Sequence, residues 1–320
     1  MKTKKRLSVP VLIIALLASL ISACTVSDNK SDYIIQDYSE NEAPPLSAGS
    51  TEAGPFTATA SGVLVTKNDK ALLDYSNTTD GYVMLKYLGT NTKVKTQVSC
   101  PSGITYTYNQ SLSGEYDVYP LSEGSGSYSI NIYENTGGTS YAMAFSFTIS
   151  VNLKDEFAPF LRSNKYVNYS SSSKVVEKSI ELCKNKSDTL AKIKAIYEFV
   201  ITNFTYDYQL AKSVQSGYIP DLDSVMDKKK GICFDYAAVM TAMLRYQGIP
   251  TKLVFGYTGS VYHAWILTYS KDSGWISTAI YFNGNEWKLM DPTFASTANS
   301  SAKIMKYIEN GANYTEKYLY

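Results

Sequence analysis

The most informative segment of the sequence runs from Gly231 to Pro250 and reads GICFDYAAVMTAMLRYQGIP. Its centre is rich in Ala, Met and Leu, which are strong helix formers, and Gly248 followed by Pro250 supplies a helix stop. Because Gly231 breaks the chain just before the helix, Cys233 is predicted to lie in the first turn. The unpaired N–H groups and the positive dipole end of a helix start favour the thiolate, the reactive form of cysteine. This stretch therefore predicts a nucleophilic cysteine.

The segments after the helix supply partners for such a cysteine. Two extended runs follow, Thr251–Tyr257 and His263–Tyr269, and His263 is the single histidine of the chain. An imidazole that activates the cysteine must therefore be this one. A hairpin turn at Asn283-Gly284 leads to Asp291, which ends a strand just before a proline. A carboxylate there can accept a hydrogen bond from one ring nitrogen of His263 while the other nitrogen faces the thiol.

Taken together, these motifs resemble a known family. The patterns G-x-C-x-x-x-A, L-R-x-x-G-I-P, G-Y, H-A-W and D-P-T are similar to those of the transglutaminase-like superfamily, which has a papain-like fold, and they cover roughly residues 190–295. The resemblance implies a catalytic triad of Cys233, His263 and Asp291. The thiolate would attack an amide carbonyl, and the thioester would pass to water or to an amine. A peptidase or amidase and a cross-linking transglutaminase both remain open.

The chain also departs from the mammalian pattern. No Trp precedes Cys233, whereas those relatives have a Trp shortly before the catalytic region that helps to bind the oxyanion. The backbone N–H of Cys233 would supply one oxyanion donor, and the second is not identified. No calcium-loop pattern is present, and a catalytic zinc site is not expected with one histidine and scattered cysteines. We therefore expect no cofactor and no metal.

Several neighbouring residues have two interpretations. Asp235 either caps the predicted helix or touches substrate, and capping is favoured. Trp265 and Trp287 are interpreted as core residues rather than substrate contacts. Lys228–Lys230 is most simply a solvated loop. The alternative to an enzyme is a non-catalytic, surface-anchored binding protein that keeps the same fold. The presence of all three predicted triad residues argues against this alternative.

Upstream of this region, the sequence predicts a second folded unit and a tether. Residues 56–154 contain about eight short runs rich in Val, Ile, Thr and Tyr, separated by turn clusters, which is typical of an immunoglobulin-like all-β sandwich. Residues 155–320 begin with two helical patterns and form the papain-like, transglutaminase-like domain, so the class is α+β. Ser187-Asp188 is a predicted N-cap. Residues 24–55 are polar and rich in Ser, Asp, Glu and Pro, as in a flexible tether.

The N-terminus has the pattern of an export signal. A basic start, MKTKKR, precedes the apolar run VPVLIIALLASLI, which is too short for a comfortable membrane span. Leu20–Cys24 resembles the bacterial lipobox, in which the cysteine is lipidated and becomes the mature N-terminus. We expect a signal peptide at residues 1–23, a lipidated Cys24 and a location at the extracellular or periplasmic face of the cell membrane. An ordinary secretory signal and an uncleaved anchor are the alternatives.

The charge composition of the chain limits the classes of partner that we expect. The formal charge is +1, from 30 basic and 29 acidic residues, and no segment concentrates the basic ones, so nucleic acid is not an expected partner. A protein or peptide of the cell envelope is the expected substrate, and the oligomeric state is left open. With Cys24 lipidated, three cysteines remain. Cys183 lies on an apolar helix face as a buried, inert thiol, although a bridge to Cys100 is possible.

Overall fold

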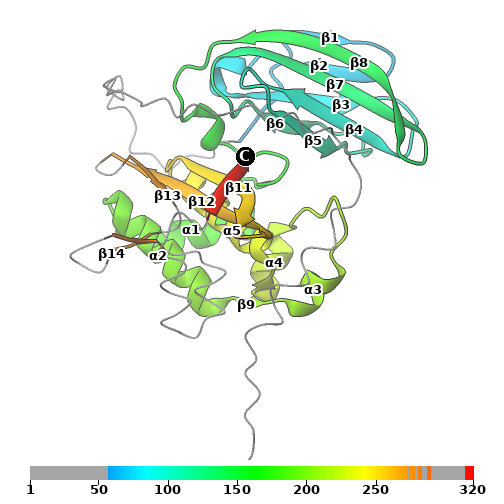
Figure 1. Cartoon of the computed structure of the whole chain (residues 1–320). Coiled ribbons are helices and arrows are strands. Elements are labelled where there is room, and N and C mark those ends of the chain that lie inside the picture. Colours follow the sequence, from blue (N-terminus) through cyan, green and yellow to red (C-terminus); the bar gives the residue numbers. More distant parts are fainter. Residues whose placement is uncertain (1–56, 272–273, 278–279, 283–286, 290–313) are drawn as a thin grey trace, which may run out of the picture.

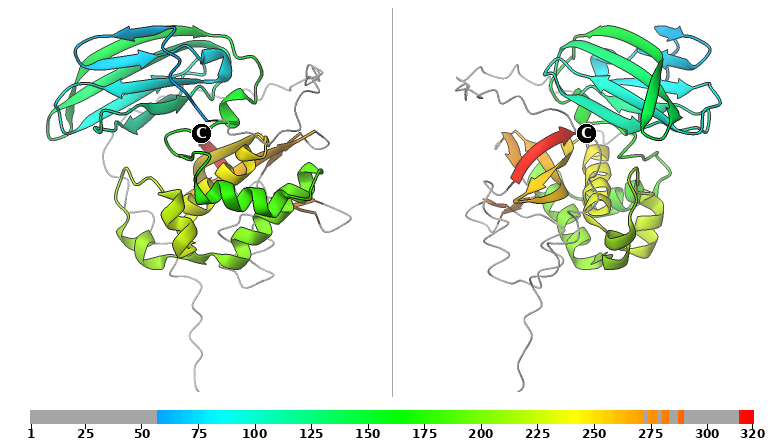
Figure 2. Two further views of the ribbon diagram at one scale, coloured as in Figure 1. Left: turned by 180° about the vertical axis from the view of Figure 1, so that it is seen from behind. Right: turned by 45° about the vertical axis from the view of Figure 1, so that its right-hand side comes forward.

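The structure, a computed structural model, describes residues 57–271, 274–277, 280–282, 287–289 and 314–320 (Figure 1). Within these ranges the chain mixes helices and sheets, as the sequence predicts. A sheet-rich N-terminal region lies beside a C-terminal region in which helices lie on one side of a second set of strands (Figures 1 and 2). The predicted signal peptide at residues 1–23, the lipidation site Cys24 and the tether to residue 55 lie outside the described residues.

Two four-stranded antiparallel sheets form the N-terminal region. One has the order β1 (Val65–Lys67), β2 (Ala71–Asp74), β3 (Tyr82–Tyr87) and β6 (Asp117–Pro120), with the 3₁₀ turn η2 (Thr78–Asp80) before β3. The other has the order β5 (Thr105–Asn109), β4 (Val94–Ser99), β7 (Gly126–Gly137) and β8 (Ser140–Val151). Side chains alternate between core and surface along β4, where Val94, Thr96 and Val98 are buried. The sheet-rich prediction is confirmed, and the immunoglobulin-like shape stays a prediction.

The C-terminal region contains five α-helices among the described residues, after the 3₁₀ turn η3 (Ala158–Phe160). They are α1 (Lys174–Cys183), α2 (Thr189–Asn203), α3 (Tyr208–Ser213), α4 (Leu222–Lys228) and α5 (Cys233–Tyr246). The predicted cap of α2 is confirmed, because the Asp188 carboxylate accepts a hydrogen bond from Ala191 N at 2.7 Å. Every residue of α5 after Cys233 is buried, and α1, α2 and α4 pack around this helix.

Helix α5 packs against an antiparallel sheet. The order of its strands is β13 (Gly274–Ser277), β12 (Val261–Ser270), β11 (Thr251–Thr258) and β16 (Tyr314–Leu319). Two short pairs complete the region: β14 (Ile280–Phe282) with β15 (Trp287–Leu289), and the parallel pair β9 (Thr205–Tyr206) with β10 (Lys230–Gly231). Gly248 ends α5 with a φ of 71°, as the predicted helix stop requires. The connection to β11 is short, so β11 runs back along α5 toward its first turn.

An aromatic junction joins the two regions. The Tyr166 ring lies 5.4 Å from Tyr108 of the N-terminal sheet and 5.7 Å from Phe234 of α5. The rings of Tyr106 and Tyr320 make a similar edge contact at 5.3 Å. One continuous buried cluster therefore extends from the N-terminal sheets to α5. The predicted boundary near residue 155 stays a prediction, and any such boundary cuts through a shared core.

The far end of α5 is held by a buried arginine. Arg245 is 0% exposed, and its guanidinium donates to three backbone oxygens: Thr251 at 2.9 Å, Arg162 at 2.6 Å and Tyr320 at 2.5 Å. Burial lowers the pKa of the guanidinium to about 10, so the group stays charged at neutral pH. Its planar fork ties together the end of α5, the start of β11, the end of the described chain and the loop after η3.

We predict that Arg245→Ala lowers the free energy of unfolding by about 3 kcal/mol, because three buried carbonyl groups lose their donor. Arg245→Lys should recover only part of this loss, since one ammonium group cannot span three separated carbonyl groups. Urea denaturation followed by circular dichroism measures both variants. The control Lys212→Ala, at an exposed basic residue, should stay within about 0.5 kcal/mol of the wild type. Equal stability of Arg245→Ala and the wild type would contradict this account.

Candidate functional site

The predicted nucleophile opens helix α5. Cys233 is its first residue and is half-buried, while the preceding Ile232 has extended backbone angles. The chain enters the helix through β10, whose Gly231 pairs with Tyr206 of β9. Two hydrogen bonds hold this entry, from Thr205 N to Lys229 O at 2.9 Å and from Asp207 N to Gly231 O at 2.8 Å. The predicted position of the cysteine at a helix start is confirmed.

Asp235 caps the start of α5 from inside. Ile232 has no side-chain oxygen with which to cap the helix, and the Asp235 carboxylate supplies the other half of a capping box by accepting from Ile232 N at 2.7 Å. The same carboxylate accepts from the Tyr218 hydroxyl at 2.6 Å and is 0% exposed. Burial raises the pKa of Asp235, and its two hydrogen bonds oppose this rise. Of the two interpretations of Asp235, capping is therefore confirmed.

Glycine at position 231 is a steric requirement of this cap. A Cβ atom on Gly231 would lie 2.4 Å from Cβ of Asp235 and 2.8 Å from its carboxylate. Real Cβ atoms do not approach other atoms this closely, and both groups belong to a constrained backbone. The helix breaker expected from the sequence thus has a second role that the sequence pattern does not indicate, namely to leave room for the capping carboxylate.

The other two described cysteines differ from Cys233. Both are free, buried thiols, so the bridge between Cys100 and Cys183 that the sequence left possible is not formed. Burial raises the pKa of Cys100 to about 12, with a further contribution from Glu123. Burial also raises the pKa of Cys183, as expected for an inert core thiol. Cys233 is therefore the one partly accessible thiol among the described residues.

His263 lies near the start of β12. It pairs with Gly256 of β11, is 5% exposed, and its ring stacks on Trp265 with the centroids 6.2 Å apart. Trp265 itself is 1% exposed in a cluster with Val254, so its interpretation as a core residue is confirmed. The side chain of Trp287 lies outside the described residues.

The structure places Cys233 and His263 at the same level of the helix–sheet pair. Phe234 packs on Phe255 with centroids 4.8 Å apart, and Phe255 pairs with Ala264, the residue next to His263. Strand alternation, however, directs the His263 ring to the face opposite Ala264. A catalytic hydrogen bond often tightens only when substrate binds, so the triad stays a prediction.

The third predicted triad member, Asp291, lies outside the described residues. Two residues that the sequence did not single out as site residues surround Cys233. Burial raises the pKa of both the Tyr206 and the Tyr262 hydroxyl, and the nearby Cys233 raises each further. No sequence signal distinguishes Tyr262 from the other tyrosines of the chain. Within the described ranges, no group of three or more His, Cys, Asp or Glu residues converges as a metal site would.

Comparison with known proteins places this site in a family. Residues 177–292 match the sequence model of the Transglutaminase-like superfamily (Transglut_core). The chain carries a transglutaminase-like domain. The chain is similar to the uncharacterized protein YebA of Bacillus subtilis (strain 168), with 27% identity over 124 residues and a match that covers 31% of this chain and 16% of that protein. The chain therefore spans less than a fifth of that relative's length.

Two solved structures are also similar to the chain. One, described as a candidate cysteine protease from Cytophaga hutchinsonii, is 14% identical, with coverage of 80% of this chain and 73% of that chain and a TM-score of 0.36. The other is the periplasmic domain of TgpA from Pseudomonas aeruginosa, which is 15% identical, with coverage of 78% and 79% and a TM-score of 0.33. Across the described residues, no helix is long and apolar enough to cross a membrane.

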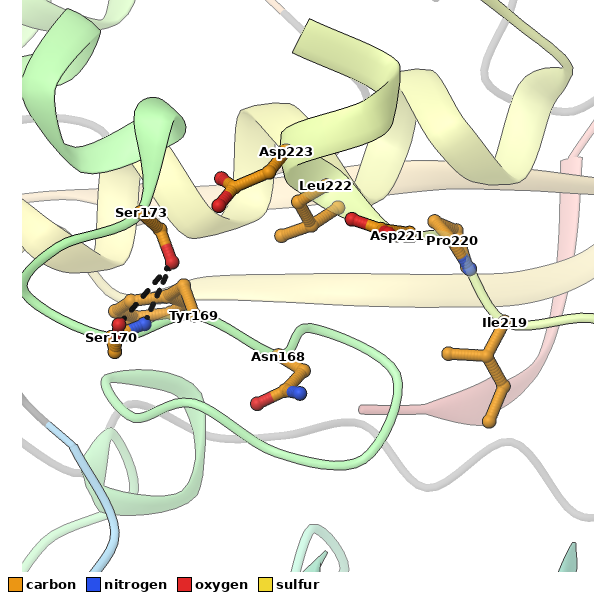
Figure 3. Close-up of a pocket in the computed structure, with 9 residues that line it drawn as sticks. All are labelled: Asn168, Tyr169, Ser170, Ser173, Ile219, Pro220, Asp221, Leu222 and Asp223. Atoms are coloured by element: carbon orange, nitrogen blue, oxygen red, sulfur yellow. Dashed lines mark hydrogen bonds between the residues drawn. The ribbon is translucent and has the colours of Figure 1, made fainter.

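A cavity of about 460 Å³ lies elsewhere in the transglutaminase-like domain, between the segments that precede α1 and α4 (Figure 3). Its polar groups already serve the helix starts. Asp223 accepts from Lys174 N at 2.8 Å, and Asp221 accepts from Ser224 N at 3.2 Å. Ser173 accepts from Ser170 N at 3.0 Å (Figure 3). Neither Cys233 nor His263 lines this cavity.

We predict that iodoacetamide modifies Cys233 in the folded protein at neutral pH and leaves Cys100 and Cys183 unmodified. The reason is that burial keeps the latter two protonated and inaccessible, whereas Cys233 is half-buried at a helix start. Peptide mapping by mass spectrometry locates the label. A sample unfolded in urea is the control and should be labelled at all three positions. Labelling of Cys100 or Cys183 ahead of Cys233 would rule out this assignment.

Proposed function

We propose that the protein is a cell-envelope thiol acyl-transfer enzyme that acts on amide bonds of protein or peptide substrates. The observation that carries this proposal is Cys233 itself, the one partly accessible described cysteine, at the start of a buried helix in a transglutaminase-like domain. The other two described thiols are held protonated in the core. A partly exposed position at a helix start is one of the environments in which a cysteine acts as a nucleophile.

The proposed reaction has two steps. The Cys233 thiolate forms a bond to the amide carbonyl carbon, and the carbonyl oxygen becomes an oxyanion near the Cys233 N–H. The C–N bond then breaks as His263 gives a proton to the leaving amine, which leaves a thioester on Cys233. Asp291 holds the imidazole in the orientation that this transfer needs. Water or a second amine then attacks the thioester, and the thiolate is released.

The acyl acceptor decides between a peptidase or amidase and a transglutaminase. We favour water, because no feature of the described residues marks a separate site for an amine. A fluorescent primary amine, dansylcadaverine, distinguishes the two when it is added with a glutamine-containing protein such as casein. Incorporation of the amine indicates transfer, and release of carboxylate without incorporation indicates hydrolysis.

We predict that Cys233→Ala abolishes acyl transfer and that His263→Ala is nearly as damaging, because the chain has no second histidine. Asp291→Ala should cost less, since this residue orients the imidazole rather than transferring a proton. The Cys233/His263 double variant should be hardly worse than either single variant, because the two residues act as a unit. Rates are compared between folded variants of similar melting temperature.

The control for this series is Cys183→Ala, which removes a thiol from the core without touching the proposed site. It should keep the wild-type rate in the folded protein. The rival function is a non-catalytic, surface-anchored binding protein with the same fold. That rival takes the place of the enzyme if Cys233→Ala keeps the full biological effect of the wild type.

We further propose that the protein is exported and anchored by a lipid on Cys24, with residues 1–23 removed as a signal peptide and residues 24–55 serving as a flexible tether. The lipobox-like segment Leu20–Cys24 supports this proposal. The finer architecture that we propose for residues 56–154 is an immunoglobulin-like sandwich, supported by two four-stranded antiparallel sheets.

We predict that Cys24→Ala releases the protein to the medium or leaves an unprocessed precursor, because no residue is then available for lipidation. Membrane fractionation with immunoblotting measures both outcomes, and metabolic labelling with palmitate reports the lipid directly. Cys183→Ala again serves as the matched control and should remain in the membrane fraction. A processed Cys24→Ala protein that stays in the membrane would show that the anchor is something else.

A further inference from the structure

We propose that Tyr218 and Asp235 are positioning residues for acyl transfer, which hold the backbone N–H of Cys233 where the oxyanion forms. This inference rests on the proposed function and adds two residues to it. Neither belongs to the predicted triad, and neither is proposed to touch substrate.

Asp235 is an unusually demanding group to bury. Its carboxylate is fully shielded from solvent, and within the described residues it forms no ion pair. Its two partners, Ile232 N–H and the Tyr218 hydroxyl, are neutral donors. A buried charge with neutral partners costs free energy that an exposed Ser or Thr cap would avoid. The arrangement is therefore better explained by what it positions than by helix stability alone.

The hydrogen bonds around Asp235 fix the backbone next to Cys233. The bond from Ile232 N to Asp235 fixes the residue before the nucleophile, and the Ile232 carbonyl accepts from Tyr236 N at 3.2 Å. The peptide plane that carries the Cys233 N–H is thereby held between two anchored groups. No acceptor within the described residues takes the Cys233 N–H, as expected at the first turn of a helix. It remains an oriented donor beside the thiol.

Tyr218 contacts the first turn of α5 at two residues. Its hydroxyl bonds to Asp235, and its ring packs edge-on against Phe234 with centroids 6.2 Å apart. One side chain therefore contacts both of the residues that follow Cys233. Removing its hydroxyl frees one carboxylate oxygen of Asp235 while the ring contact with Phe234 is kept. This property makes Tyr218→Phe a narrow test.

The segment that carries Tyr218 is anchored in turn by the N-terminal region. Gly217 has a φ of 91°, and a Cβ atom there would lie 2.0 Å from Nδ2 of Asn109, at the end of β5. The close approach of this amide is possible only because the residue is glycine. The Asn109 side chain also accepts a hydrogen bond from Lys95 of β4 at 2.5 Å. The N-terminal sheet thus contacts the loop that holds the start of α5.

The test compares two reactions of the same thiol. p-Nitrophenyl acetate acylates a thiolate through a tetrahedral oxyanion and releases p-nitrophenolate, whereas iodoacetamide alkylates it by direct displacement of iodide without an oxyanion. We expect Tyr218→Phe to lower the acylation rate by at least about 10-fold, since a displacement on the order of 1 Å in a catalytic group can cost about 100-fold. The alkylation rate should stay within about twofold. Cys233→Ala supplies the background for both reactions.

Two further variants separate positioning from stability. Asp235→Asn keeps an oxygen that can accept from Ile232 N–H and should retain more acylation than Asp235→Ala, at matched fractions of folded protein. The matched control Tyr119→Phe removes a buried tyrosine hydroxyl, which donates to Gln110 at 2.8 Å in the N-terminal region, and should leave the ratio of the two rates unchanged.

Each outcome decides the proposal. A lower ratio of acylation to alkylation in Tyr218→Phe, with no change in Tyr119→Phe, supports it. An unchanged ratio in Tyr218→Phe, including a parallel fall of both rates with stability, overturns it while leaving the proposed function intact. If wild-type Cys233 is alkylated but never acylated, the proposed function fails, and this inference fails with it.

Discussion

The hydrogen bond from Ile232 N–H to the Asp235 carboxylate is the constraint on which the site depends. It lets Ile232, whose side chain cannot cap a helix, occupy the N-cap position. The nucleophile can therefore be the first helical residue. The bond also dictates its surroundings. Gly231 must lack a Cβ atom, and Tyr218 must supply the second donor, because a buried carboxylate with one partner would be left half-satisfied.

The opposite end of α5 is also held by a buried charged side chain, here a positive one. Asp235 lies in the first turn and Arg245 in the last, and both are fully buried. A negative charge near the N-terminus and a positive charge near the C-terminus each interact favourably with the helix dipole. Neither relies on an oppositely charged side chain among the described residues. Backbone groups satisfy most of their hydrogen bonds instead, so each charge ties α5 to its neighbours.

Two contacts connect the N-terminal sheets to the start of α5. The aromatic junction around Tyr166 joins them to Phe234, and the contact of Asn109 with Gly217 joins them to the Tyr218 loop. The first connection ends at the residue after Cys233, and the second ends at the loop whose Tyr218 donates a hydrogen bond to Asp235. The N-terminal region therefore shares the core that supports the nucleophile.

The sequence by itself determined the local features of this protein. The helix formers between Gly231 and Gly248, the cap at Asp188 and the alternation along the N-terminal strands depend on neighbours a few residues away, so pattern and propensity suffice to predict them. Ordered motifs also identified the transglutaminase-like domain. Contacts between distant segments could be found only in the tertiary structure. The burial of Arg245, the Tyr218–Asp235 bond and the face of β12 that carries His263 depend on how helices and strands pack, and no short-range pattern encodes that packing.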